Sequence, residues 1–189
     1  MNRWILLILV GLLSVGCQLP EARKPVQRSS GSFIQESAER NKIRYEEEIA
    51  GLEALIEQDS SHNYYPTEQG FWYYDQQRDT ITSYTPTTGD LVEFTYSVTS
   101  TAGEMLISRE ENGVQQYKVD QSNQDLISGI RQGLKFMKAG EQVTFLFPSY
   151  FAYGYYGLQN RVGRNQPVYC SVELISITPD NTNNSNTEQ

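Results

Sequence analysis

Apolar residues recur at helical spacing early in the chain. Between residues 33 and 59 one stripe holds five apolar side chains: Tyr45, Ile49, Leu52, Leu55 and Ile56. The stripe is narrow and the other positions are rich in glutamate, so the pattern predicts an amphipathic helix over residues 33–60. Such a helix can dock on its own domain, pair with a second copy or meet a partner, and docking is the interpretation we prefer.

After residue 60 the pattern changes to the two-residue alternation that is typical of strands. It is clearest from Leu91 to Ser100, where Val92, Phe94 and Tyr96 share one face with Val98. Further strands are predicted at residues 70–74, 80–84, 105–107, 116–119, 143–147 and 168–177. We assign residues 61–88 to extra strands and a connector, and residues 89–177 to the main domain.

One late segment returns to helical spacing, with Leu126, Ile127, Ile130, Leu134 and Met137 on its apolar face. Gly129 and Gly133 lie inside it, although each costs about 1 kcal/mol relative to alanine. We therefore expect a second backbone close to this helix, or a helix pressed into a concave sheet. A loop over residues 149–167 follows the next strand and is dense in tyrosine. Helix and loop together predict an apolar hollow beside the loop, in an α+β fold of mostly antiparallel strands.

The two ends of the chain have a different character. An apolar run from Trp4 to Leu13 follows Arg3 and is shorter than the roughly 20 residues that span a bilayer. Residues 1–16 fit a secretory signal, and the segment ending at Cys17 resembles a bacterial lipoprotein signal. An acylated Cys17 would hold the protein on a membrane, facing the extracytoplasmic side of the outer or inner membrane. The alternatives are an ordinary signal peptide and an uncleaved anchor. Residues 17–32 are predicted to be a flexible tether, and residues 178–189 a disordered tail.

Composition narrows the possible chemistry. The net charge of −8 argues against nucleic acid as a partner, since nucleic-acid binding requires basic surface. His62 is the single histidine and stands in a polar stretch, where a solvated side chain is the preferred interpretation. There is no metal-binding spacing and no nucleotide-binding glycine loop, so we expect no metal and no cofactor. If Cys17 is acylated, Cys170 has no partner and is expected to be a buried thiol.

A series of spaced motifs runs from Gly89 to Ile177. It comprises Gly89-Asp90 before Val92-x-Phe94-x-Tyr96, Leu126-Ile127-x-Gly129-x-x-x-Gly133-Leu134, Phe147-Pro148 before Ala152-Tyr153-Gly154, and Asn165-Gln166-Pro167-Val168. In order and spacing this series resembles the FKBP class of peptidyl-prolyl cis-trans isomerases. With the lipoprotein signal and Gly70-Phe71-Trp72-Tyr73, the chain also looks like the gliding-motility-associated FKBP-type lipoproteins of Bacteroidetes. The resemblance implies a bent antiparallel sheet wrapped around the short helix.

The resemblance also implies a site between helix and sheet. Its catalytic positions would be Tyr96, Tyr117, Leu126, Ile127, Ile130 and Tyr153, and its further substrate-binding positions Leu106, Val162 and Cys170. Three positions depart from the usual pattern. Ile130 replaces tryptophan, Cys170 replaces phenylalanine, and Ile107 stands where a carboxylate is usual. The floor of the site is therefore expected to be smaller and less aromatic.

Three functions remain open at this point. The first is prolyl isomerisation of proline-containing exported proteins, some of which would belong to gliding or secretion machinery, as the resemblance implies. The second is a weakly catalytic or non-catalytic FKBP-type chaperone or scaffold on a membrane. The third, which we consider weaker, is glycan binding by the tyrosine loop. The helix over residues 33–59 is a candidate for homodimer formation under any of them.

Overall fold

The computed structural model describes residues 30–77, 84–121 and 126–180. The chain divides into two units, residues 1–41 and residues 42–189. Helix α2 (Ser30–Gln58) belongs to the second unit from Lys42 onward, and it begins and ends slightly before the predicted range of 33–60. The predicted signal peptide, Cys17 and nearly all of the tether lie outside the described residues. No helix in the described part of the chain is both long and apolar enough to cross a membrane.

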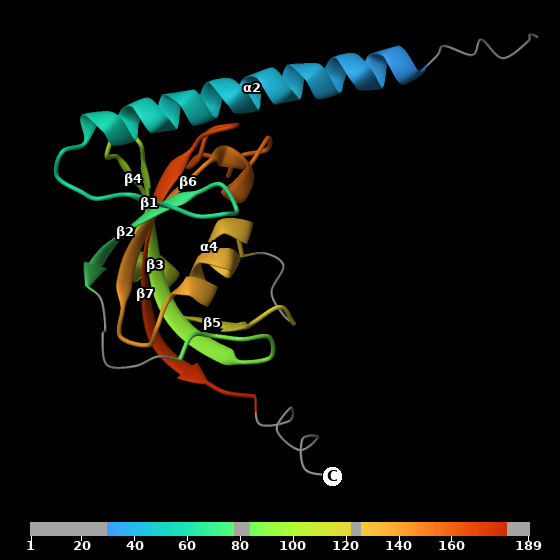
Figure 1. Ribbon diagram of the computed structural model, residues 1–189. Coiled ribbons are helices and arrows are strands. Elements are labelled where there is room, and N and C mark those ends of the chain that lie inside the picture. The colour runs from blue at the N-terminus through green and yellow to red at the C-terminus, as the bar shows by residue number, and fades with distance from the viewer. Residues whose placement is uncertain (1–29, 78–83, 122–125, 181–189) are drawn as a thin grey trace, which may run out of the picture. The chain divides into compact units, whose positions relative to one another are not determined.

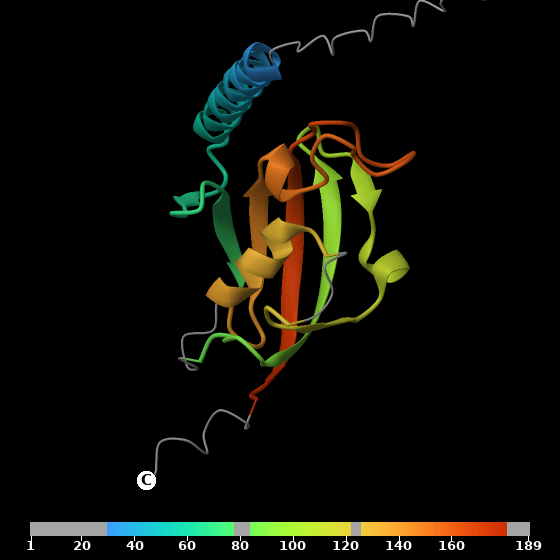
Figure 2. The ribbon, with the colours of Figure 1, turned by 90° about the vertical axis from the view of Figure 1, so that its right-hand side faces the viewer.

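A seven-stranded antiparallel sheet forms the body of the second unit (Figures 1 and 2). Its strands are β1 (Tyr65–Pro66), β2 (Trp72–Gln77), β3 (Leu91–Ser100), β4 (Met105–Ile107), β5 (Gln115–Lys118), β6 (Gln142–Phe147) and β7 (Val168–Thr178). The order across the sheet is β1-β2-β6-β7-β3-β4, and β5 also pairs with β3. The long β3–β7 pair is interrupted by a register shift between Glu93 and Phe94. Such irregularities increase the local twist and bend of a strand.

The late helix, α4 (Ser128–Gly133), lies across the sheet in front of β6 and β7 (Figure 2). It continues as a 3₁₀ turn, Leu134–Phe136, so it is shorter than the predicted segment. A Cβ atom on Gly129 would lie 2.8 Å from the ring of Phe147, and one on Gly133 would lie 2.8 Å from the ring of Phe145. Of the two explanations for these glycines, the structure shows a helix pressed onto the sheet, against aromatic rings rather than another backbone.

The core fills the space between α4 and the sheet. Its fully buried members include Phe94, Tyr117, Ile130, Leu134, Phe145, Phe147, Cys170 and Leu174. The rings of Phe145 and Phe147 stack with their centroids 5.3 Å apart, and Phe71 packs edge-on against both. Alternate β6 residues occupy the two faces of the sheet, and Leu146 is buried as well, so β6 is covered on both sides.

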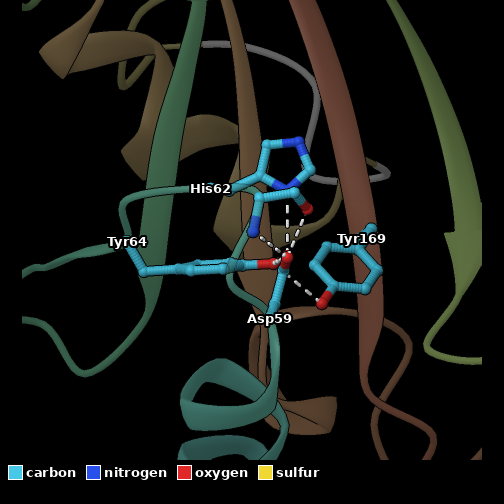
Figure 3. Close-up of polar contacts among 5 residues, drawn as sticks. Asp59, His62, Tyr64 and Tyr169 are labelled. Atoms are coloured by element: carbon cyan, nitrogen blue, oxygen red, sulfur yellow. Dashed lines mark hydrogen bonds and ion pairs between the residues drawn. The ribbon is translucent and has the colours of Figure 1, made fainter.

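The segment that follows α2 is fastened to the sheet by a polar cluster (Figure 3). The Asp59 carboxylate accepts hydrogen bonds from the backbone N–H of Ser61 at 2.9 Å and from the hydroxyl of Tyr64 at 2.8 Å. The Tyr64 hydroxyl in turn lies 3.1 Å from the hydroxyl of Tyr169 in β7. The Ser61 hydroxyl and the His62 ring, whose Nδ1 lies 2.8 Å from the carboxylate, also hydrogen-bond to Asp59. These hydrogen bonds hold the pKa of Asp59 well below its ordinary value, with the Ser61 hydroxyl contributing most. Together with the buried Leu52, they attach the second half of α2 to its own domain.

Several boundaries differ from the predictions. Arg109–Asn112 forms a one-turn helix, α3, with the Ser108 hydroxyl as its cap, between the predicted strands at 105–107 and 116–119 where no helix was predicted. The predicted tail from residue 178 starts too early, because Thr178 belongs to β7 and the N–H of Asp180 donates to Asp90 at 2.9 Å. The short strand β1 was not predicted. Most of the predicted strand at 80–84, and residues 181–189, lie outside the described residues.

Candidate active site

A hollow of about 350 Å³ opens between the start of α4, the sheet and the long loop that joins β6 to β7. Its lining comprises Tyr96, Ile107, Asn112, Ile127, Tyr153, Leu158, Gln159 and Arg161. Strands β3 and β4 supply the first two residues, and α3 supplies the third. Ile127 immediately precedes α4, and the other four belong to the β6–β7 loop. The walls are therefore apolar toward the sheet and polar toward the loop.

The nine predicted site residues separate into two groups. Tyr96, Ile127 and Tyr153 line the hollow itself. The other six belong to or pack against the core: Tyr117, Leu126, Ile130, Val162 and Cys170 are buried, and Leu106 is half-buried. We call this second group the floor. It supports the hollow, but these side chains do not form its open surface.

Sequence reasoning missed most of the polar lining. Asn112, Gln159 and Arg161 come from a polar turn and from a loop without periodicity, so no pattern singled them out. Ile107 was recognised only as the replacement of a carboxylate, yet it is buried and lines the hollow. Apart from Ile107, none of these residues stands at a position that the motifs of the sequence analysis singled out, so the sequence offered no signal for them. We call Asn112, Tyr153, Leu158, Gln159 and Arg161 the mouth of the site.

Backbone hydrogen bonds of the residues before and after Tyr153 fix its position. The carbonyl of Ser149 accepts from the N–H groups of Ala152 at 3.0 Å and of Gly154 at 2.8 Å, and the N–H of Asn165 donates to the carbonyl of Gly154 at 2.8 Å. Burial raises the pKa of Tyr153 above its ordinary value, so its hydroxyl stays protonated at neutral pH. No hydrogen bond joins this hydroxyl to another described residue, so it is available as a donor toward the hollow.

Ile127 supplies an apolar wall and a backbone donor. Its φ and ψ of −55° and 143° are extended, and the α4 helix begins at the next residue. The N–H groups at the start of a helix have no intrahelical acceptor. Among the described residues, no backbone carbonyl accepts a hydrogen bond from the N–H of Ile127. It lies at the edge of the hollow with the potential to bind a carbonyl oxygen.

An ion pair crosses the mouth. The Arg161 guanidinium of the β6–β7 loop contacts the Glu111 carboxylate of α3. The hydrogen bond from Arg161 holds the pKa of Glu111 below its ordinary value. The Asn112 side chain, next to Glu111, donates to the carbonyl of Tyr96 at 3.3 Å. Helix α3 is therefore connected both to the β6–β7 loop and to strand β3.

Neither the His62 cluster nor Cys170 has the geometry of a covalent catalytic site. Around His62, the Ser61 hydroxyl and the Asp59 carboxylate both approach the same ring nitrogen, Nδ1, at 3.1 and 2.8 Å (Figure 3). A catalytic triad needs the nucleophile and the carboxylate on different nitrogens. No group of three or more potential ligands is placed to hold a metal in this part of the chain. Cys170 is completely buried, and burial raises the pKa of its thiol, so it is not a reactive thiolate.

An antiparallel sheet bent around one short helix, with an apolar hollow at the helix start, is the arrangement that the resemblance to the FKBP class implies. The family model described as FKBP-type peptidyl-prolyl cis-trans isomerase matches residues 82–175, and this domain of the chain belongs to that family. The predicted FKBP family, α+β fold class and isomerase class are thereby confirmed, whereas the resemblance to gliding-motility-associated lipoproteins stays a prediction. The matched range nearly coincides with the predicted domain of residues 89–177, beginning slightly before it and ending slightly before its end.

Solved structures of two bacterial proteins show a similar fold. A peptidyl-prolyl cis-trans isomerase from Pseudomonas syringae pv. tomato is 20% identical, with a TM-score of 0.56, and the match covers 71% of this chain and 96% of that one. FkpA from Escherichia coli is 18% identical, also with a TM-score of 0.56, and the match covers 95% of this chain and 83% of FkpA. At these identities the similarity extends to the fold and does not assign the individual site residues.

Proposed function

We propose that the protein isomerises Xaa–Pro bonds in exported proteins, at the extracytoplasmic side of a membrane to which an acylated Cys17 anchors it. The observation that carries the site assignment is the hollow. It combines apolar walls, Tyr96 and Ile127, with one uncommitted hydroxyl, that of Tyr153. Such a surface suits a proline ring, and the donors suit the carbonyl groups on either side of it. The anchoring and the exported clients rest on the sequence of residues 1–17.

Rotation about a prolyl bond breaks no covalent bond. The barrier of roughly 18–20 kcal/mol arises from amide resonance, which is stronger when the planar, polar ground state is hydrated. In our mechanism the apolar walls remove water from the bond, and this favours the twisted, less polar transition state. The hydroxyl of Tyr153 and the N–H of Ile127 bind substrate carbonyl groups and hold the flanking chain while the amide rotates.

The mechanism is tested by measuring cis–trans exchange of an Xaa-Pro peptide by NMR. Wild type should accelerate exchange over buffer, and Ile127→Ala and Tyr153→Phe should each reduce kcat/KM by about tenfold, because each loses about one good contact. Val114→Ala is the matched control, since Val114 is 59% exposed and lies outside the hollow. Equal exchange with wild type, with the variants and in buffer would refute the proposed mechanism.

Anchoring is tested separately in cells. Wild type should partition into detergent and gain the mass of its acyl chains on Cys17, whereas Cys17→Ser should be released in soluble form or retain its signal segment. An ordinary signal peptide predicts soluble wild type that begins near residue 17. An uncleaved anchor predicts membrane-bound protein that retains residues 1–16 and carries no lipid.

The second candidate function is a membrane-tethered chaperone or scaffold with little turnover. The observation that favours it is the complete burial of Ile130 and Cys170, which leaves neither side chain exposed to a substrate. Under this hypothesis the protein suppresses aggregation of an unfolded client but does not change the rate of prolyl exchange. Under our preferred proposal, exchange is accelerated and Tyr153→Phe reduces it.

A homodimer through α2 and a role in gliding or secretion machinery are further parts of the proposal. Ile34 and Ile43 are 62% and 47% exposed, so α2 retains apolar surface beyond the part that is docked. Sedimentation of wild type and of Ile34→Lys/Ile43→Lys tests pairing without disturbing the buried Leu52. A dimer that the double substitution dissociates supports the proposal, and a monomeric wild type contradicts it. Loss of gliding or secretion upon deletion of the gene, restored by wild type, would support the cellular role.

A further inference from the structure

The turn that leads to Tyr153 is capped by a residue from outside the family domain. The Glu48 carboxylate of α2 accepts two hydrogen bonds from Ser149, one from its backbone N–H and one from its hydroxyl, the latter at 2.7 Å. Ser149 is 5% exposed, so both of its donors need protein partners. Residue 48 lies far upstream of the matched range 82–175 and yet satisfies both donors at the start of the β6–β7 loop.

Ser149 connects this cap to Tyr153. It opens the 3₁₀ turn Ser149–Phe151, and its carbonyl accepts from the N–H groups of Ala152 and Gly154, the two neighbours of Tyr153. The donors of Ser149 are thus fixed by Glu48, while its acceptor fixes the backbone on both sides of the tyrosine. Hydrogen bonds to a charged carboxylate are stronger than those between neutral groups, so Glu48 is the firmest anchor of Ser149.

A second contact joins the same two segments. The ring of Tyr45, one helical turn before Glu48, meets the ring of Tyr150 edge-on with centroids 5.3 Å apart. Behind the turn, the Ser128 hydroxyl at the start of α4 donates to the carbonyl of Phe151 at 3.2 Å. The turn is therefore held between α2 on one side and α4 on the other, and it has little freedom while both contacts persist.

We propose that Glu48 is a positioning residue for the isomerase site, acting through Ser149 on the Tyr153 hydroxyl. Helix α2 is then part of the catalytic unit as well as a connector. The inference rests on the proposed function, because it requires that Tyr153 donate to the substrate. It predicts that removal of the Glu48 carboxylate lowers kcat/KM for prolyl exchange mainly while the Tyr153 hydroxyl is present.

A double-mutant cycle tests this prediction. Prolyl exchange is measured for wild type, Glu48→Ala, Tyr153→Phe and the double variant, at a temperature well below the thermal midpoint of each. Glu48→Ala should lower kcat/KM about 3- to 10-fold in the wild-type background and less than about 2-fold in the Tyr153→Phe background. Glu48→Gln keeps one acceptor oxygen and should fall between wild type and Glu48→Ala. Glu53→Ala, an exposed glutamate on the same helix, is the control.

The NMR signals of the Tyr153 ring and of the Ala152 and Gly154 amides give a second measurement that does not depend on turnover. They should shift in Glu48→Ala and stay unchanged in Glu53→Ala. Equal losses of activity in both backgrounds, or unshifted signals, would show that Glu48 only stabilises the fold and would overturn the inference. If wild type and Tyr153→Phe are both inactive, the proposed mechanism itself is wrong, and the catalytic role of Glu48 is wrong with it.

Discussion

The floor and the mouth of the candidate site are held in place by different forces. Ile130, Tyr117 and Cys170 of the floor are at most 1% exposed and sit in the main core, between α4 and the sheet. Tyr153 and Arg161 of the mouth stand on a loop fixed by a few hydrogen bonds and an ion pair, some of them from segments far away in the chain. The floor should therefore affect stability more than activity, and the mouth should do the reverse.

The largest expected effect is on the floor. Ile130→Ala removes a side chain that is 0% exposed and leaves a cavity, so it should reduce the free energy of unfolding by about 2–5 kcal/mol. Urea denaturation measures the change. Val114→Ala, at an exposed position, should change the unfolding free energy by less than about 0.5 kcal/mol. A loss of less than about 1 kcal/mol for Ile130→Ala would mean that the floor is loosely packed.

The contact between α4 and β6 gives the next effect. Gly133→Ala places a Cβ atom 2.8 Å from the fully buried ring of Phe145, which packs against the rings of Phe71 and Phe147. We expect a loss of about 1–3 kcal/mol from overpacking, although alanine is the better helix former. Gly51→Ala in α2 is a matched control, because its new Cβ would meet nothing within 4 Å. That substitution should stabilise the protein by about 0.5–1 kcal/mol. Equal effects of the two substitutions would refute the steric explanation.

The contrast between floor and mouth also explains which parts of the fold and of the site could be predicted from the sequence. Strand β3 was predicted with both of its ends because Val92, Phe94 and Val98 alternate with polar residues and face one core. The glycines of α4 pointed to a close contact, and family spacing located Tyr96, Ile127 and Tyr153. Periodicity carries this information because packing against one core imposes it.

The mouth has no such periodicity. Glu48 and Ser149 are 101 positions apart, and Glu111 and Arg161 are 50 positions apart. Both pairs join segments whose proximity is decided only when the sheet has formed. A glutamate on an exposed helix face looks the same in sequence whether it meets solvent or a buried serine. Long-range polar contacts between irregular segments were therefore beyond the reach of pattern analysis.

Tyr153→Phe should separate the two regions most clearly. It removes only a hydroxyl that has no hydrogen-bond partner among the described residues, so the free energy of unfolding should change by less than about 0.5 kcal/mol. Activity should fall by about tenfold, which corresponds to about 1.4 kcal/mol of transition-state stabilisation. Paired urea denaturation and prolyl exchange give both numbers. A large decrease in the free energy of unfolding would show that Tyr153 stabilises the fold, as the floor residues do.

The smallest expected effect concerns charge at the mouth. Glu111→Gln leaves the Arg161 cation without its carboxylate partner, beside the position where residues flanking a bound proline would lie. We expect the ratio of kcat/KM for Glu-Pro over Lys-Pro peptides to rise about two- to fivefold, and the rise to shrink in high salt, because the pair is solvent-exposed. Arg161→Gln leaves the Glu111 carboxylate unpaired instead and should shift the same ratio in the opposite direction.

Acid provides an independent check on this ion pair in the wild type. The folded-state pKa of Glu111 is depressed, so the pair is intact above the ordinary glutamate value of 4.5 and is lost as pH falls through the lower folded-state value. The wild-type preference should therefore approach that of Glu111→Gln only in acid. The ratio for Arg161→Gln should also rise in acid, because protonation removes the unpaired Glu111 carboxylate, but at a higher pH than in wild type, since the hydrogen bond that lowers the pKa of Glu111 is lost. Both comparisons are made after the ionisation of the peptides themselves is subtracted. If both substitutions leave the ratio unchanged at every pH, clients do not pass beside the ion pair, and the mouth selects them by shape alone.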